Sequence, residues 1–113
     1  MDNKTKGKKG EDLAKSHYQA LGFEILEENY RYKRCEIDLI ALLKEELLVF
    51  IEVKNRSRSD FGNPESFVSD AQMGRIKEAA EDYIYAINWQ KDIRFDIVSI
   101  SDNQQIEVFK DAF

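Results

Sequence analysis

The residues best suited to chemistry in this 113-residue chain are two acids and a lysine, Asp38, Glu52 and Lys54. Asp38 lies within the apolar segment 36–43, and Glu52 and Lys54 lie where the next apolar segment, 47–53, comes to its end. Because side chains at positions i and i+2 share one face of a strand, Glu52 and Lys54 are expected to point the same way. The pattern therefore predicts an acid and a cation side by side on one strand.

A hairpin would bring the two acids together. Residues 44–46 are polar and join the two segments, although they lack the Asn-Gly or Asp-Gly pair that marks the strongest hairpin turns. If Leu43 opposes Leu47 across this turn, the same register places Asp38 opposite Glu52 on one face, about 5 Å apart.

Two carboxylates held so close repel each other, and each loses hydration on burial. A hard divalent cation such as Mg²⁺ or Mn²⁺ would offset this repulsion, because it prefers oxygen ligands. The ammonium of Lys54 could then orient or activate an attacking water, or stabilise developing negative charge. The alternative is an ordinary surface ion pair between Glu52 and Lys54. The matching register of Asp38 and the apolar run before Glu52 favour the metal site.

Apolar periodicity predicts the elements that must hold these residues. The first helix spans residues 8–21, and Gly22 ends it. Apolar runs predict five strands, over residues 23–30, 36–43, 47–53, 93–100 and 105–109. A second helix follows the capping-box pattern at residues 69–72 and continues to about residue 87, after a long loop at 55–68.

The predicted element order is α-β-β-β-α-β-β, which indicates an α/β fold with a mixed sheet flanked by helices. We expect a single domain over residues 1–113, with residues 1–7 forming a flexible basic terminus.

Composition and charge limit the classes of protein to which this chain can belong. No apolar run is long enough to cross a bilayer, and the basic start of the chain is unlike a secretory signal. For this reason we expect no membrane partner. The lone Cys35 cannot form an internal disulfide, so we expect a cytoplasmic protein. The net charge of −5 argues weakly against a nucleic-acid coat protein, yet basic clusters at residues 4–9, 31–34 and 54–58 allow a local basic surface.

Asp38 followed by Glu52-Val53-Lys54 resembles the PD-(D/E)xK signature of the restriction-endonuclease-like superfamily. Further motifs along the whole chain resemble the YraN-like family of uncharacterised bacterial proteins. They are GEDLA at 10–14, EIDLIA at 36–41, LVFIEVKNR at 48–56, RFD at 94–96 and DAF at 111–113. The resemblance implies a restriction-endonuclease-like fold, similar in arrangement to the archaeal Holliday-junction resolvases.

The resemblance also implies roles for individual residues. It assigns Asp38 and Glu52 as ligands of Mg²⁺ or Mn²⁺ and Lys54 as the catalytic lysine. Glu11 matches an acid that completes the metal site in such nucleases, and its alternative role is that of an acid at a helix N-terminus. Glu36 shares the strand face of Asp38, and it could assist the site or pair with a neighbouring basic residue, Lys33 or Arg34.

Four further residues are candidates for contact with nucleic acid. Arg56, Arg58 and Arg75 could bind phosphates, or they could simply be solvated side chains of a loop and a helix. Gln72 lies near a glutamine of the family pattern, but it could instead be the capping-box partner of Ser69. Cys35 is interpreted as a packing residue, because no histidine or base accompanies it in a nucleophilic arrangement.

Three functions follow as hypotheses. The first is a divalent-metal-dependent endonuclease that hydrolyses DNA phosphodiester bonds, with branched DNA as one candidate substrate. The second is a nucleic-acid-binding module of the same fold with little or no turnover. The third is an interaction protein in which Tyr83, Tyr85 and Trp89 form the face of a homodimer.

Overall fold

The computed structural model describes residues 3–56 and 68–113. The elements follow along the chain as α1 (Asn3–Ala20), β1 (Glu24–Tyr32), β2 (Cys35–Leu43), β3 (Leu47–Asn55), α2 (Asp70–Ile87), β4 (Asp92–Ile100) and β5 (Ile106–Phe109). The predicted α/β class and the predicted order of helices and strands are confirmed.

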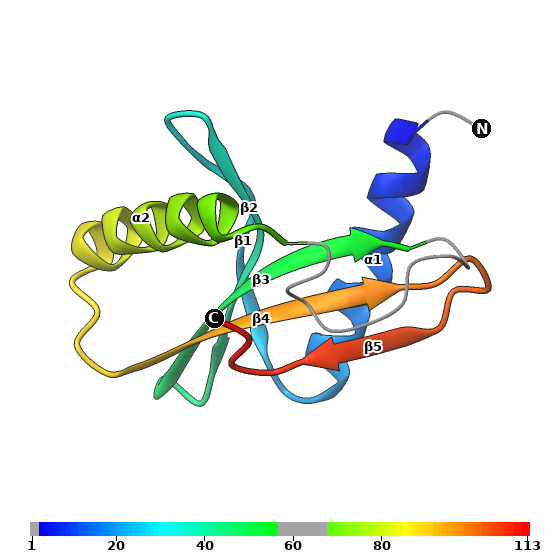
Figure 1. Ribbon diagram of the computed structural model, residues 1–113. Coiled ribbons are helices and arrows are strands. Elements are labelled where there is room, and N and C mark those ends of the chain that lie inside the picture. The colour runs from blue at the N-terminus through cyan, green and yellow to red at the C-terminus, as the bar shows by residue number, and fades with distance from the viewer. Residues whose placement is uncertain (1–2, 57–67) are drawn as a thin grey trace.

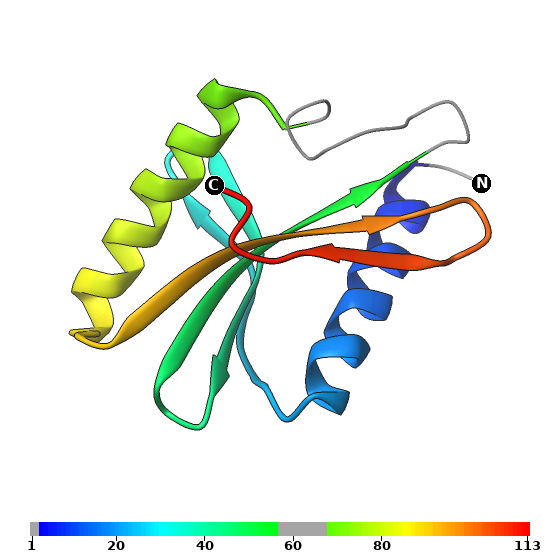
Figure 2. The ribbon, with the colours of Figure 1, turned by 60° about the horizontal axis from the view of Figure 1, so that its bottom comes forward.

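The five strands form one mixed sheet in the order β1-β2-β3-β4-β5. Neighbouring strands are antiparallel except for β3 and β4, which are parallel. A parallel pair needs a crossover connection, and α2 lies on that connection. Figures 1 and 2 show α1 and α2 on opposite sides of the sheet.

Strand β3 is buried on both faces, which explains its almost continuous apolar sequence. Val49 and Ile51 belong to the core that Ala14 and Tyr18 of α1 cover. Phe50 faces the other core, where the buried residues of α2 are Ile76, Ala79, Ala80 and Tyr83. Within the described residues, no helix is long and apolar enough to cross a membrane.

The β2–β3 hairpin has the register predicted from the sequence. Leu43 pairs with Leu47, and the antiparallel ladder continues as far as Leu39 and Ile51. Beyond that pair, the first residues of β2 and the last residues of β3 no longer pair with each other. Figures 1 and 2 show the β1–β2 hairpin turning away from β3 at this end, so the sheet opens there.

The ends of the helices differ in part from the prediction. Helix α1 begins at Asn3 instead of residue 8. Lysine is a good helix former, which favours this extension. The flexible basic terminus over residues 1–7 stays a prediction. Gly22 has φ +95° just after the helix, as its role as a stop signal requires. Ser69 caps α2 by accepting a hydrogen bond from the backbone N–H of Gln72 at 3.1 Å.

The three aromatic residues predicted to form the face of a homodimer do not all lie at the surface. Tyr83 is buried in the core under α2, and the indole Nε1 of Trp89 donates to the carbonyl of Asp92 at 3.0 Å. Only Tyr85 of the three projects fully into solvent. The helical spacing that predicted α2 does not show which of its aromatic residues the sheet would cover.

A buried charge network ties the end of the chain to β4 and α1. Asp96 is fully buried and accepts two hydrogen bonds of 2.8 Å from Arg94. It also accepts one of 2.7 Å from the Tyr18 hydroxyl and one of 3.1 Å from the backbone N–H of Asp111. The ring of Phe113 packs on Phe95, with the ring centroids 5.0 Å apart. The RFD and DAF motifs thus meet in the structure and hold its C-terminal end.

Candidate metal and nucleic-acid site

Asp38 lies on β2 where that strand separates from β3. Its Oδ2 accepts a hydrogen bond of 2.7 Å from the backbone N–H of Val53. Because the ladder between these strands has already ended at Ile51, the carboxylate takes the place of a strand carbonyl as acceptor. This bond fixes Asp38 against the segment of β3 that carries Glu52.

Glu52 is almost completely buried, with 6% of its surface exposed. Its Oε2 accepts a hydrogen bond of 3.1 Å from the side-chain amide of Gln72, on α2. Burial raises the pKa of Glu52 well above its usual range, and the hydrogen bond and negative charge of the adjacent Asp38 raise it further. The two acids therefore lie together, as the hairpin register predicted.

Lys54 lies close enough to Glu52 to affect its ionisation. The positive charge of Lys54 lowers the pKa of Glu52 and so opposes the effects of burial and of Asp38. Gln72 acts in the same direction, because its N–H donor favours the ionised carboxylate. The group thus combines two acids, one cation and one neutral donor.

Glu11 lies well inside α1, because that helix begins at Asn3. The first turn of α1 contains no acidic residue, so the alternative role of Glu11 as a helix N-terminal acid is wrong. Burial raises the pKa of Glu11 to about 7, and the charges of Asp38 and Glu36 contribute to the rise. Glu11 therefore lies on the Asp38 side of the acid pair.

An asparagine joins Glu11 to Glu36. With its side-chain nitrogen oriented to donate, Asn29 bonds Oε1 of Glu11 at 2.6 Å and Oε1 of Glu36 at 3.0 Å. Oε2 of Glu36 lies 3.8 Å from the guanidinium of Arg31, its cross-strand partner on β1. Glu36 thus pairs with Arg31, not with the predicted Lys33 or Arg34.

The donor set of the acid pair suits a hard divalent cation. One oxygen of Asp38 and one of Glu52 are held by N–H donors, and these bonds do not occupy the second oxygen of either carboxyl group. Within residues 3–56 and 68–113, no group of three or more His, Cys, Asp or Glu side chains is arranged to hold a metal ion. Of the three predicted ligands, Asp38 and Glu52 interact directly in the structure, and Glu11 interacts electrostatically with Asp38.

The residues predicted to contact nucleic acid lie in different surroundings. Arg56 is joined to β4, because its backbone N–H donates to Ile100 at 2.7 Å and its guanidinium donates to Ser99 at 3.4 Å. Arg75 is exposed on α2, and Gln72 points to Glu52 instead of outward. Arg58 lies outside the described residues.

Sequence reasoning missed the two donors that organise the acid pair. The N–H of Val53 is a backbone group, and no residue type signals that it will bond a side chain. Gln72 was predicted either to contact nucleic acid or to cap α2 with Ser69, and neither prediction linked it to Glu52. Its contact with Glu52 depends on where α2 lies relative to β3, which local sequence does not report.

Comparison with known proteins gives a consistent family match. The model of the uncharacterised protein family UPF0102 matches residues 10–100. A UPF0102 protein of Flavobacterium psychrophilum is 42% identical over 95% of this chain and 92% of its own length. One of Dictyoglomus turgidum is 48% identical over 88% of this chain and 85% of its own. One of Natranaerobius thermophilus is 36% identical over the whole of both chains.

Proposed function

We propose that this chain, which belongs to the uncharacterised protein family UPF0102, is a divalent-metal-dependent endonuclease that hydrolyses phosphodiester bonds of DNA. The family membership agrees with the YraN-like resemblance of its motifs. The family name specifies no activity, so the proposal depends on the site and not on the relatives.

The observation that supports the proposal most strongly is the buried acid pair. Asp38 and Glu52 come from two neighbouring strands and lie together where the sheet opens, with Lys54 beside them. Burying two adjacent acids destabilises a fold unless a cation or proton compensates them. A buried acid pair therefore lowers the stability of the fold, which is typical of functional carboxylates.

Each residue has a distinct task in the proposed reaction. Asp38 and Glu52 would hold Mg²⁺ or Mn²⁺, which when bound polarises the phosphoryl group toward attack by water. Val53 and Gln72 keep the two carboxyl groups in position through their N–H donors. Lys54 orients the attacking water or stabilises the negative charge that develops on the phosphate. Glu11 interacts electrostatically with Asp38, and this supports the part in the metal site that the family resemblance implies for it.

The architecture supports a restriction-endonuclease-like fold as the framework of this site. The element order is the α-β-β-β-α-β-β order expected for it, and the acids lie on the second and third strands. The pairing of β2 and β3 ends just before the two acids, at Leu39 and Ile51.

The experiment is a cleavage assay on linear, circular and four-way-junction DNA in Mg²⁺ or Mn²⁺. The variants Asp38→Asn, Glu52→Gln and Lys54→Met each remove one charge with little change in shape. We expect each to lower the cleavage rate by about 100-fold or more. Glu46→Gln is the matched control, because Glu46 is an exposed acid in the turn at the other end of the same hairpin.

Two results would count against this proposal. Cleavage that survives unchanged in Asp38→Asn and Lys54→Met would arise from another site or a contaminant. Salt-dependent DNA binding without cleavage of any of the three substrates would favour the nucleic-acid-binding module instead.

A further inference from the structure

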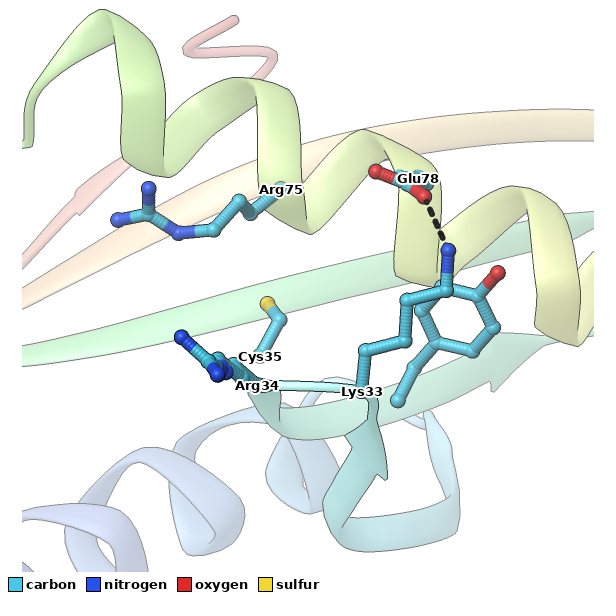
Figure 3. A pocket seen from close by; sticks show the side chains of 6 residues that line it. Lys33, Arg34, Cys35, Arg75 and Glu78 are labelled. Atoms are coloured by element: carbon cyan, nitrogen blue, oxygen red, sulfur yellow. Dashed lines mark hydrogen bonds and ion pairs between the residues drawn. The ribbon is translucent and has the colours of Figure 1, made fainter.

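A pocket of about 260 Å³ lies between the β1–β2 turn and α2. Its lining residues are Tyr32, Lys33, Arg34, Cys35, Arg75 and Glu78. Figure 3 shows Arg34 and Arg75 at one end of the pocket, with the thiol of Cys35 between them. At the other end, Nζ of Lys33 donates to Oε1 of Glu78 at 3.2 Å. The name Arg34–Arg75 pocket is used below for this cavity.

The charges of this pocket are unevenly compensated. The ion pair with Glu78 neutralises Lys33, whereas no carboxylate of the described residues forms an ion pair with Arg34 or Arg75. Two guanidinium groups that share one small cavity repel each other, and an anion between them would relieve that repulsion. The planar N–H fork of arginine matches a phosphate better than a lysine ammonium does. The positive charge and the N–H donors of the pocket therefore favour a phosphate group as its ligand.

The pocket adjoins the acid pair. Burial raises the pKa of the Cys35 thiol, the nearby Glu52 carboxylate raises it further, and Arg75 lowers it. Cys35 thus lies within electrostatic range of both Glu52 and Arg75. On α2, Arg75 follows Gln72 by three residues, which is close to one helical turn or about 5 Å along the axis. Gln72 is the residue that bonds Glu52.

A nucleic-acid strand with one phosphate at the acid pair carries further phosphates along its backbone, and the neighbouring Arg34–Arg75 pocket offers two guanidinium groups to one of them.

We infer that the Arg34–Arg75 pocket binds a backbone phosphate of a nucleic-acid strand whose neighbouring phosphate lies at Asp38 and Glu52. The position of that neighbouring phosphate rests on the proposed function, but binding in the pocket needs no metal. Arg34, which the sequence analysis placed only in a basic cluster, is expected to contribute to binding as much as Arg75.

Fluorescence anisotropy with a short labelled oligonucleotide, single-stranded or duplex, tests this inference in EDTA. We expect Arg34→Ala and Arg75→Ala each to weaken binding about 5- to 10-fold at low salt and to lower the salt slope by about one. Arg31→Ala and Lys77→Ala remove the same charge from exposed positions outside the pocket and should bind like the wild-type protein. Unchanged binding in the pocket variants, equal losses in the controls, or no binding by the wild-type protein would overturn the inference.

A second readout uses the position of Cys35, which is the only cysteine of the chain. The oligonucleotide should slow alkylation of Cys35 by iodoacetamide in the wild-type protein and have no effect in the Arg34→Ala/Arg75→Ala variant. Protection by inorganic phosphate without protection by the oligonucleotide would mean that the pocket takes a small phosphate compound, and the inference would fail.

Failure of this inference is distinguishable from failure of the proposed function. Loss of binding in the pocket variants, with no cleavage by the wild-type protein, would retain the phosphate pocket and reject the nuclease. Cleavage that depends on Asp38 and Glu52, with normal binding and cleavage in Arg34→Ala and Arg75→Ala, would retain the nuclease and reject the pocket.

Discussion

The carboxylate of Asp38 accepts a 2.7 Å hydrogen bond from the backbone N–H of Val53, just past the last ladder pair of β2 and β3. A side chain of one strand thus satisfies the backbone of the other at the point where the sheet opens. The same bond holds Asp38 next to Glu52, the residue before Val53. The two acids therefore meet at the same place where β2 and β3 stop pairing.

Replacing Asp38 tests this bond separately from the charge. Asp38→Asn keeps an oxygen acceptor for the Val53 N–H, whereas Asp38→Ala leaves that N–H without a partner. Both variants remove the negative charge beside Glu52. We expect Asp38→Asn to be more stable than Asp38→Ala by about 1–3 kcal/mol in urea unfolding. Equal stabilities would show that the hydrogen bond contributes nothing to the fold.

Glu52→Gln is expected to stabilise the metal-free protein at pH 8. The pKa of Glu52 is raised in the folded state. Ionising Glu52 therefore destabilises the fold, and this loss of stability grows as pH rises above the unfolded pKa of 4.5. Glutamine removes this cost and can still accept from Gln72. Thermal unfolding in EDTA should show a higher Tm for Glu52→Gln, with no such gain for the control Glu46→Gln. A lower Tm for Glu52→Gln would contradict the account.

Glu11 gives a pH dependence with a defined window. Its pKa rises from 4.5 to about 7, so the folded protein binds this proton more tightly than the unfolded chain does. Ionisation of Glu11 does not affect stability below about pH 4.5. As pH rises it lowers the free energy of unfolding increasingly, and this effect becomes constant above about pH 7. In Glu11→Gln the free energy of unfolding should therefore fall less between pH 5 and 7 than in the wild-type protein, both in EDTA. Parallel curves for the two proteins would refute this.

Asp96 should matter for stability and not for catalysis. Asp96→Ala leaves donors of Arg94, Tyr18 and Asp111 without their shared buried acceptor, so we expect a loss of about 3–5 kcal/mol. Tyr18→Phe removes a single hydrogen bond and should cost about 1 kcal/mol. Chemical denaturation measures both. Similar losses in the two variants would show that Asp96 is not the centre of the network.

Patterns close in sequence predicted much of this structure. Apolar runs predicted the strands, and the short turn after Leu43 predicted the register that brings Asp38 to Glu52. That register is predictable because hairpin pairing follows from turn length once one face must be buried. Gly22 marked the end of α1 because its positive φ suits glycine, and Ser69 marked the start of α2 because its hydroxyl can accept from a free backbone N–H.

The rest depends on how distant elements pack. The contact of Gln72 with Glu52 and the pocket between Arg34 and Arg75 exist because α2 lies over the start of β2. Two partners of Asp96, Tyr18 and the backbone N–H of Asp111, come from α1 and from the end of the chain. No local pattern encodes such approaches.

Calorimetric titration of the wild-type protein and its variants with Mn²⁺ tests the central claim most directly. If Asp38 and Glu52 share an ion, the wild-type protein and Glu46→Gln should bind Mn²⁺ with the same affinity. Asp38→Asn and Glu52→Gln should each weaken binding at least tenfold. Equal Mn²⁺ binding by the wild-type protein and both site variants would contradict the account.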